Sequence, residues 1–208
     1  MLISVVLPPV DGAAIAAAAA HLSRQSGEWE MVAINPPGLP DLPAAVVPVQ
    51  TTAVSPAEQL NAAALAARGD VLLFLPPGLQ LPGSAFSAIA QNFRLLPQTV
   101  GGSFHLHFSP EPFFARMTTR LVKWNRYRGR YGLESGLFVR REIFAHLGGF
   151  NPRPRAFDVE FTRRLEQAGP TLYLPQAVTM PWPGVLPGLR LLFGGTAINR
   201  QPPAGTVS

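Results

Sequence analysis

Short apolar runs separated by prolines, glycines and polar residues dominate the first part of this chain. Continuous runs rich in Val, Ile and Leu are typical of strands that are buried on both faces of a parallel sheet. The predicted strands are Leu2–Leu7, Glu30–Ile34, Val46–Gln50 and Asp70–Leu75. The segments between and after them predict helices at Ala13–Gln25, Pro56–Arg68 and Ser84–Leu96. This alternation predicts an α/β fold with a doubly wound, mostly parallel sheet flanked by helices.

The helix at Pro56 carries both a start and a stop signal. Ser55 is a typical N-cap, Pro56 suits the first helical position, and Glu58 stands three residues after the cap, as in a capping box. Gly69 is expected to end the helix.

The second half of the chain mixes further strands and helices. Strands are predicted at Gly102–Phe108, Gly136–Val139, Thr171–Leu174 and Ala177–Met180. Helices are predicted at Glu111–Tyr127, after Val139 up to Leu147, and at Phe157–Gln167. We expect one domain over residues 1–180, followed by a C-terminal extension rich in Pro and Gly over residues 181–208.

Doubly wound sheets bind their ligands at the carboxyl ends of the strands. In this chain those ends are Leu7–Asp11, Asn35–Asp41 and Leu75–Leu79. We therefore expect a ligand site there, with the second half of the chain covering it.

Composition narrows the chemistry. Hydrophobic residues make up 47% of the 208 residues and charged residues 14%, which indicates a globular protein. The absence of cysteine excludes disulfides, thiolate metal sites and a cysteine nucleophile.

No apolar stretch approaches the ~20 residues of a membrane span, and the apolar start is too short for a signal peptide. We expect a cytoplasmic protein, with peripheral contact to the inner membrane as an alternative. The net charge of +5 favours an anionic ligand or surface.

Three blocks of sequence resemble the family-2 glycosyltransferases. SVVLPPVDGA resembles their first strand and turn, and AEQLNAAALAARGDVLLFL resembles the helix and strand that lead into their metal-binding motif. SGLFVRREIFAHLGGFN, followed by FDVEFTRRLEQAG, resembles their acceptor-side block and the helix behind it. The chain is most similar to the small bacterial subgroup associated with arsenosugar biosynthesis. The resemblance implies the GT-A fold, a nucleotide-sugar donor and inverting transfer to an acceptor that it does not identify.

The resemblance also implies a set of donor-side positions. Asn35 stands where the family has an aspartate for the uracil or ribose, and Gly78 lies in PPGL, where the family has its D-x-D metal motif. The resemblance therefore identifies no cofactor, and with no acid in PPGL a divalent metal site is not expected. Asp11 is a candidate ribose or base acceptor, although an Asp-Gly pair is also ordinary turn chemistry. Arg140 and Arg141 are candidate diphosphate partners or, alternatively, surface charges.

Two acids are the catalytic candidates. Asp158 matches the surviving acid of the family's acceptor-side pair, because Phe157 stands in place of the other one. It is the candidate general base for the acceptor hydroxyl, and the alternative is an acid that complements a helix dipole. Glu134 precedes the acceptor-side block and is either an acceptor or sugar contact or a solvated loop acid.

Two further patterns have both a functional and an ordinary interpretation. His105 and His107 share one face of a predicted strand, as metal ligands would, but they lack an obvious third ligand. Residues 113–130 combine six basic residues with interleaved apolar ones. They predict a basic amphipathic helix that contacts a membrane or a lipid-linked acceptor, or else packs its apolar face on the core. No nucleic-acid module accompanies this patch, so nucleic acid is not an expected partner.

Two functions follow from these patterns. The first is a glycosyltransferase-like enzyme with Asp158 as its base. The second is a non-catalytic binding or scaffold protein that keeps the fold, because the fold alone does not guarantee activity.

Overall fold

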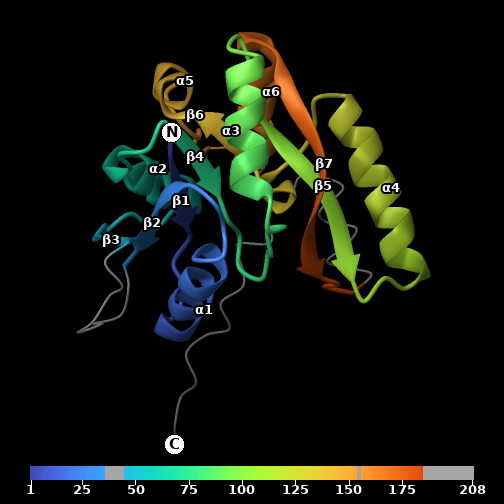
Figure 1. The fold of residues 1–208 in the computed structure, drawn as a ribbon, viewed down its shortest axis with the longest axis horizontal. Coiled ribbons are helices and arrows are strands. Elements are labelled where there is room, and N and C mark those ends of the chain that lie inside the picture. The colour runs from blue at the N-terminus through green and yellow to red at the C-terminus, as the bar shows by residue number, and fades with distance from the viewer. Residues whose placement is uncertain (36–44, 154–155, 185–208) are drawn as a thin grey trace, which may run out of the picture.

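The computed structural model describes residues 1–35, 45–153 and 156–184. A seven-stranded sheet forms its centre, in the order β3-β2-β1-β4-β6-β5-β7 (Figure 1). The strands are β1 Leu2–Leu7, β2 Glu28–Ile34, β3 Val46–Val49, β4 Val71–Phe74, β5 Gly101–Ser109, β6 Phe138–Arg140 and β7 Thr171–Pro181. The helices are α1 Gly12–Leu22, α2 Pro56–Ala66, α3 Ala85–Leu95, α4 Phe113–Tyr127, the 3-10 turn η1 Leu133–Ser135, α5 Arg141–His146 and α6 Phe157–Ala168.

The sheet is mostly parallel, as predicted. β1 pairs in parallel with β2 and β4, β2 with β3, and β5 with β7. Within this sheet only β6 runs antiparallel, between β4 and β5. The predicted single α/β domain with helices flanking the sheet is therefore confirmed. Because β6 is reversed, its start lies at the same edge as the carboxyl ends of the other strands.

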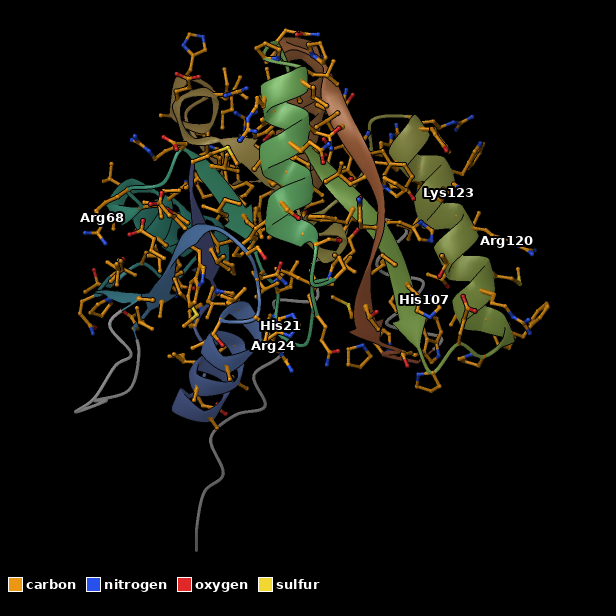
Figure 2. The ribbon with its side chains drawn as sticks, viewed as in Figure 1. His21, Arg24, Arg68, His107, Arg120 and Lys123 are labelled. Carbon is orange, nitrogen blue, oxygen red and sulfur yellow. The ribbon has the colours of Figure 1, made fainter. Side chains whose placement is uncertain are left out.

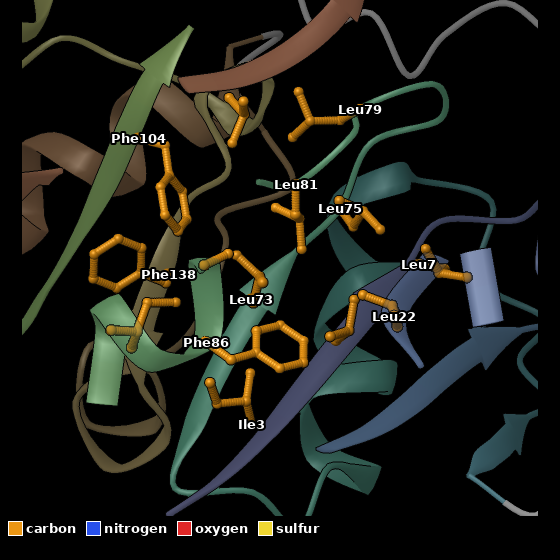
Figure 3. Packing of buried hydrophobic residues seen from close by; sticks show 14 of the residues in the cluster. Ile3, Leu7, Leu22, Leu73, Leu75, Leu79, Leu81, Phe86, Phe104 and Phe138 are labelled. Atoms are coloured by element: carbon orange, nitrogen blue, oxygen red, sulfur yellow. The ribbon is translucent and has the colours of Figure 1, made fainter. Parts of the chain in front are cut away.

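Two hydrophobic clusters lie on opposite faces of the sheet. Leu22 of α1 and Phe86 of α3 share one cluster with Ile3 of β1 (Figure 3). Leu60 of α2 and Phe161 of α6 belong to the cluster on the other face. Since both faces of the central strands are buried, those strands are apolar along their whole length rather than alternating.

Two local predictions differ from the structure. The strands predicted at Thr171–Leu174 and Ala177–Met180 form the single strand β7, because its pairing with β5 continues through a register shift between Phe104 and His105. Ser55 precedes α2 but makes no side-chain capping hydrogen bond, so the predicted capping box does not form.

The basic segment forms α4, but its apolar side does not pack on the core. The residues that α4 buries are Ala115, Thr118, Val122 and Arg126. Its exposed large apolar residues are Phe113, Phe114, Met117, Leu121, Trp124 and Tyr127. The core-packing interpretation of these large residues is therefore wrong, because the helix packs on the sheet through its opposite side instead. No helix within the described ranges is long and apolar enough to cross a membrane.

Glu30 forms a buried polar network that the sequence did not predict. Its Oε1 accepts hydrogen bonds from Ser4 Oγ and from the backbone N–H of Arg68, both at 2.6 Å. Its Oε2 accepts from the Arg68 guanidinium at 2.8 Å. Burial by itself raises the pKa of Glu30, but these hydrogen bonds and the charge of Arg68 outweigh burial and hold the pKa below its ordinary value.

Replacing Glu30 with Gln is expected to lower the free energy of unfolding by about 1–3 kcal/mol at neutral pH, because buried donors lose a charged acceptor. The lowered pKa of Glu30 means that its ionised form stabilises the fold above the unfolded-state pKa. That contribution is lost as the pH falls through the folded-state pKa. Urea unfolding at neutral and acidic pH checks this, with Glu28→Gln as a control, because Glu28 is exposed on the same strand. An equal loss at both pH values would contradict the ionic role.

Candidate active site

Glu134 and Asp158 come together at the edge of the sheet where β4 ends. Glu134 belongs to η1, which lies just before β6, and Leu73 of β4 pairs with Phe138 at the start of β6. Asp158 lies in the first turn of α6, and its Oδ2 accepts a hydrogen bond from the backbone N–H of Leu133 at 3.2 Å. The two predicted catalytic acids, 24 residues apart in sequence, therefore share one site.

Gly132 lies between the two carboxyl groups, and the sequence analysis did not single it out. A Cβ placed on Gly132 would collide with Oδ2 of Asp158 and with Oε2 of Glu134. Its backbone N–H also donates to Oε1 of Glu134 at 3.2 Å. A side chain at this position would therefore have to displace one or both carboxyl groups. The available signal was a glycine two residues before a candidate acid, which is too common to interpret from sequence alone.

Burial dominates the electrostatics of this pair. The exposed fraction is 8% for Glu134 and 2% for Asp158. Burial, followed by repulsion from Asp158, raises the pKa of Glu134 to about 8. Burial raises the pKa of Asp158 to about 6, although the backbone N–H groups of Leu133 and Val159 lower it in part. In the described part of the chain neither acid forms an ion pair. The two groups therefore hold about one proton between them near neutral pH.

Phe157 explains how α6 presents Asp158. Its buried ring packs against Phe150 at a centroid distance of 5.2 Å, and Phe150 in turn contacts Phe161 at 5.0 Å. The loop before α6 is fixed to α2, since Asn61 donates to the carbonyl of Phe150 and accepts from its N–H, both at 2.8 Å. The phenylalanine in place of the family's first acid is thus an anchor for the helix start. It leaves Asp158 turned toward Leu133.

The donor-side candidates Asp11 and Asn35 follow the ends of β1 and β2. Asp11 is exposed and caps α1, because its Oδ1 accepts from the backbone N–H of Ala14 at 2.7 Å. Asn35 has a left-handed backbone with φ of 44°, and its side-chain amide exchanges two hydrogen bonds with the backbone of Thr51. The Asn35 side chain therefore joins the loops after β2 and β3. Residues 36–44, which include the rest of that predicted strand end, lie outside the described residues.

The segment in the position of the D-x-D motif packs against β7. Leu79 is buried, and Gln80 bridges to Thr179 of β7 through two backbone hydrogen bonds of 2.8 and 2.9 Å. Gly78 faces Pro181, whose ring carbons Cδ and Cγ would lie 3.4 and 3.6 Å from a Cβ at that position. Pro76–Leu79 offer no side-chain oxygen. These residues do not fit a divalent metal, whose protein ligands are mainly carboxylates.

Arg140 and Arg141 lie at the opposite ends of the strands, where the parallel strands begin. Arg140 pairs with Val71, the first residue of β4, and its side chain donates to the carbonyl of Thr99 at 2.7 Å. Arg141 donates through Nε to the carbonyl of Gly69 at 2.8 Å. Both guanidinium groups bind backbone at the amino ends of the parallel strands, so their predicted contact with a diphosphate at the carboxyl ends does not fit this geometry. The reversal of β6 is the reason.

The two predicted histidines have protein partners. His105 Nδ1 is 2.6 Å from the Tyr173 hydroxyl, and His107 Nδ1 is 3.7 Å from Glu111 Oε1. Among the described residues there is no group of three metal-ligating side chains. The pair therefore belongs to the contacts of β5 with β7 and with the start of α4.

Comparison with known proteins identifies the fold. No protein-family model matches the chain, and no curated protein matches it in sequence. S. aureus TarS 1-349 in complex with UDP-GlcNAc aligns with a TM-score of 0.65 at 13% identity, over 92% of this chain and 65% of that one. The mannosyltransferase PcManGT from Pyrobaculum calidifontis in complex with GDP-Man and Mn²⁺ aligns with a TM-score of 0.62 at 16% identity, over 86% and 56%. The chain thus has the fold of GT-A-type glycosyltransferases but spans less than two thirds of either structure.

Proposed function

We propose that this chain is a glycosyltransferase that moves a sugar from a nucleotide-sugar donor to an acceptor hydroxyl, with inversion at the anomeric carbon. The observation that carries the proposal is the buried pair of Glu134 and Asp158 at the carboxyl edge of the sheet. The similar structures support the donor class, because they were determined with UDP-GlcNAc and with GDP-Man.

The chemistry assigns different roles to the two acids. Burial raises the pKa of both acids, so the pair shares about one proton near neutral pH. We assign the charge to Asp158, because the backbone N–H groups of Leu133 and Val159 both donate to its carboxylate. Asp158 takes the proton of the acceptor hydroxyl as that oxygen attacks the anomeric carbon. The bond from this carbon to the diphosphate oxygen breaks, and the nucleoside diphosphate leaves with the electron pair. Glu134 acts by holding its proton beside Asp158 and by lining the acceptor side.

On the donor side, Asp11 is the residue we propose to contact the ribose or base, since its carboxylate is exposed at the start of α1. We also propose Asn35 and the backbone carbonyl of Gly78 as donor contacts, because they follow β2 and β4 at the same edge of the sheet. Arg140 and Arg141 lie outside the proposed site, because their guanidinium groups bind backbone at the amino ends of the strands. The arsenosugar subgroup, the lipid-linked acceptor and the cytoplasmic location stay predictions from the sequence.

A second function, a non-catalytic binding protein of the same fold, is favoured by one specific observation. The segment at the D-x-D position is anchored to β7 through Gln80 and has a buried Leu79. This arrangement supplies no charge to offset a departing diphosphate. A protein that binds a glycan or nucleotide without turning it over needs none.

Calorimetry against UDP-, GDP- and dTDP-sugars, with and without Mn²⁺, tests the proposal. We expect one donor to bind and Asp11→Ala to weaken its binding. Asp11→Ser is the matched control for capping, because serine also caps a helix but is shorter than aspartate. If the serine variant binds the donor normally, Asp11 acts only as a cap.

The same donor then tests catalysis. Asp158→Asn is expected to keep donor affinity and to lower the rate of transfer by about 10²–10⁴-fold, because the base is lost. Glu58→Gln, which removes an exposed acid from the first turn of α2, is the control. Binding without turnover in the wild-type protein favours the non-catalytic function, and a folded protein that binds no donor contradicts both the donor and the transferase proposals.

A further inference from the structure

The outer face of α4 is apolar, although no part of the described chain covers it. Exposed fractions are 63% for Phe113, 52% for Trp124 and 69% for Tyr127. Phe113, Met117, Leu121 and Trp124 follow one another at intervals of three or four residues, so they line one side of the helix. The buried residues Ala115, Thr118, Val122 and Arg126 occupy the opposite side. The surface of a monomeric soluble protein rarely carries this many large apolar side chains together unless they bind a partner.

Positive charge flanks this apolar face. Apart from the buried Arg126, the basic side chains of residues 113–130 are Arg116, Arg120, Lys123, Arg128 and Arg130. Figure 2 shows Arg120 and Lys123 along α4 at the edge of the molecule. In the described ranges none of the five forms an ion pair. No acid occurs from Pro112 to Leu133, so nothing within the segment offsets these charges.

The helix is firmly attached to the fold, so its outer face is presented as a fixed surface. The guanidinium of Arg126, on the inner side, bonds to Ser103 on β5 at 2.8 Å and to Glu166 on α6 at 3.1 Å. It also stacks over Tyr131 at 4.0 Å, immediately before Gly132. Glu134 follows Tyr127, the last residue of α4, by only seven residues. Docking of α4 on a partner would thus keep Glu134 and Asp158 close to that partner.

We propose that α4 docks this protein onto an anionic phospholipid surface. The helix lies in the plane of the interface, its aromatic and aliphatic side chains enter the boundary between headgroups and acyl chains, and its arginines pair with lipid phosphates. Charge complementarity selects this occupant: a bilayer with anionic lipids presents continuous negative charge beside an apolar layer, and α4 presents the matching pair. A single helix face of this composition gives reversible, salt-sensitive binding rather than insertion.

Vesicle co-sedimentation tests this proposal. The wild-type protein is expected to bind vesicles of phosphatidylcholine mixed with phosphatidylglycerol, and to bind pure phosphatidylcholine at least about tenfold more weakly. Binding should fall when salt is added. Arg120→Glu combined with Lys123→Glu should lower the partition coefficient by at least about tenfold, because it reverses two charges. Phe113→Ser combined with Trp124→Ser should also lower it by at least about tenfold, because it removes two apolar side chains from the interface.

A matched control lies on α3, where Arg94 and Leu95 are both exposed. Arg94→Glu with Leu95→Ser removes one charge and one apolar side chain away from α4 and should leave binding unchanged. Circular dichroism confirms that each variant is folded. A second readout is the emission of Trp124, which should shift to the blue and be quenched by brominated lipid, with Trp124→Phe as the reference.

Three outcomes overturn the proposal. They are no binding to anionic vesicles by the folded wild-type protein, binding that the α4 variants do not weaken, and sedimentation velocity showing a dimer that Phe113→Ser with Trp124→Ser dissociates. The last outcome would mean that a second copy of the chain covers the face. Because none of these measurements requires a sugar donor, failure here is distinguishable from failure of the proposed transferase.

Discussion

Glu134→Gln is expected to raise the free energy of unfolding by about 2–4 kcal/mol at pH 8 and above, because the wild-type fold buries two acids side by side. The glutamine amide carries no charge, so it removes both the burial penalty and the repulsion toward Asp158. Its oxygen still accepts from Gly132, and its NH₂ group lies beside Asp158 as a donor. A substitution that stabilises the fold while impairing the site is a signature of function.

The pH dependence of this effect follows from the direction of the pKa shift. The folded-state pKa of Glu134, about 8, lies above the unfolded value, so the folded state binds the proton more tightly than the unfolded state. Wild-type stability should therefore fall as the pH rises from the unfolded pKa to about 8, and then level off. Urea unfolding of wild type and Glu134→Gln across this range checks it, and the difference should shrink to under about 1 kcal/mol near pH 5. A difference that does not change with pH would show that Glu134 is not a buried ionisable partner of Asp158.

Arg126→Met is expected to lower the free energy of unfolding by about 2–4 kcal/mol, because it leaves one buried and three half-buried acceptors without their donor. The hydrogen-bond partners of this guanidinium are Ser103 Oγ, Glu166 Oε1, Thr171 Oγ1 and the carbonyl of Leu172. They belong to β5, α6 and β7, so one side chain joins α4 to three other elements. Methionine matches the length of the aliphatic stem but replaces none of these bonds.

Arg128→Met is the matched control for this prediction. Arg128 lies two residues away, stacks on the exposed ring of Trp124 at 3.8 Å and makes no ion pair in the described part of the chain. Its loss should change stability by less than about 1 kcal/mol. Urea unfolding with an unchanged slope separates lost stability from a change in the unfolded state. Similar effects of the two substitutions would mean that the buried network does not hold α4.

The order of elements and the class of fold were predictable from local pattern alone. The apolar runs at Leu2–Leu7 and Asp70–Leu75 become β1 and β4 because a strand covered on both faces must be apolar throughout. Asp158 and Glu134 were identifiable as candidates, since acids before and after an acceptor-side block are visible as residue types in order. Their positions in sequence, however, say nothing about the distance between them.

Tertiary structure alone decided which of the candidates meet. Reversal of β6 carries Glu134 to the carboxyl edge of the sheet and sends Arg140 to the other edge, and strand direction is not encoded in a three-residue run. Packing also decided which side of α4 is buried. The stripe of large apolar residues and the stripe of Ala115, Thr118, Val122 and Arg126 both fit a helix of this period, and only the packing of α4 on β5 selects the second. The sequence by itself thus determined the elements and the candidate chemistry, because these depend on local propensity and residue type. The site itself depends on contacts between residues far apart in the chain, which no local pattern specifies.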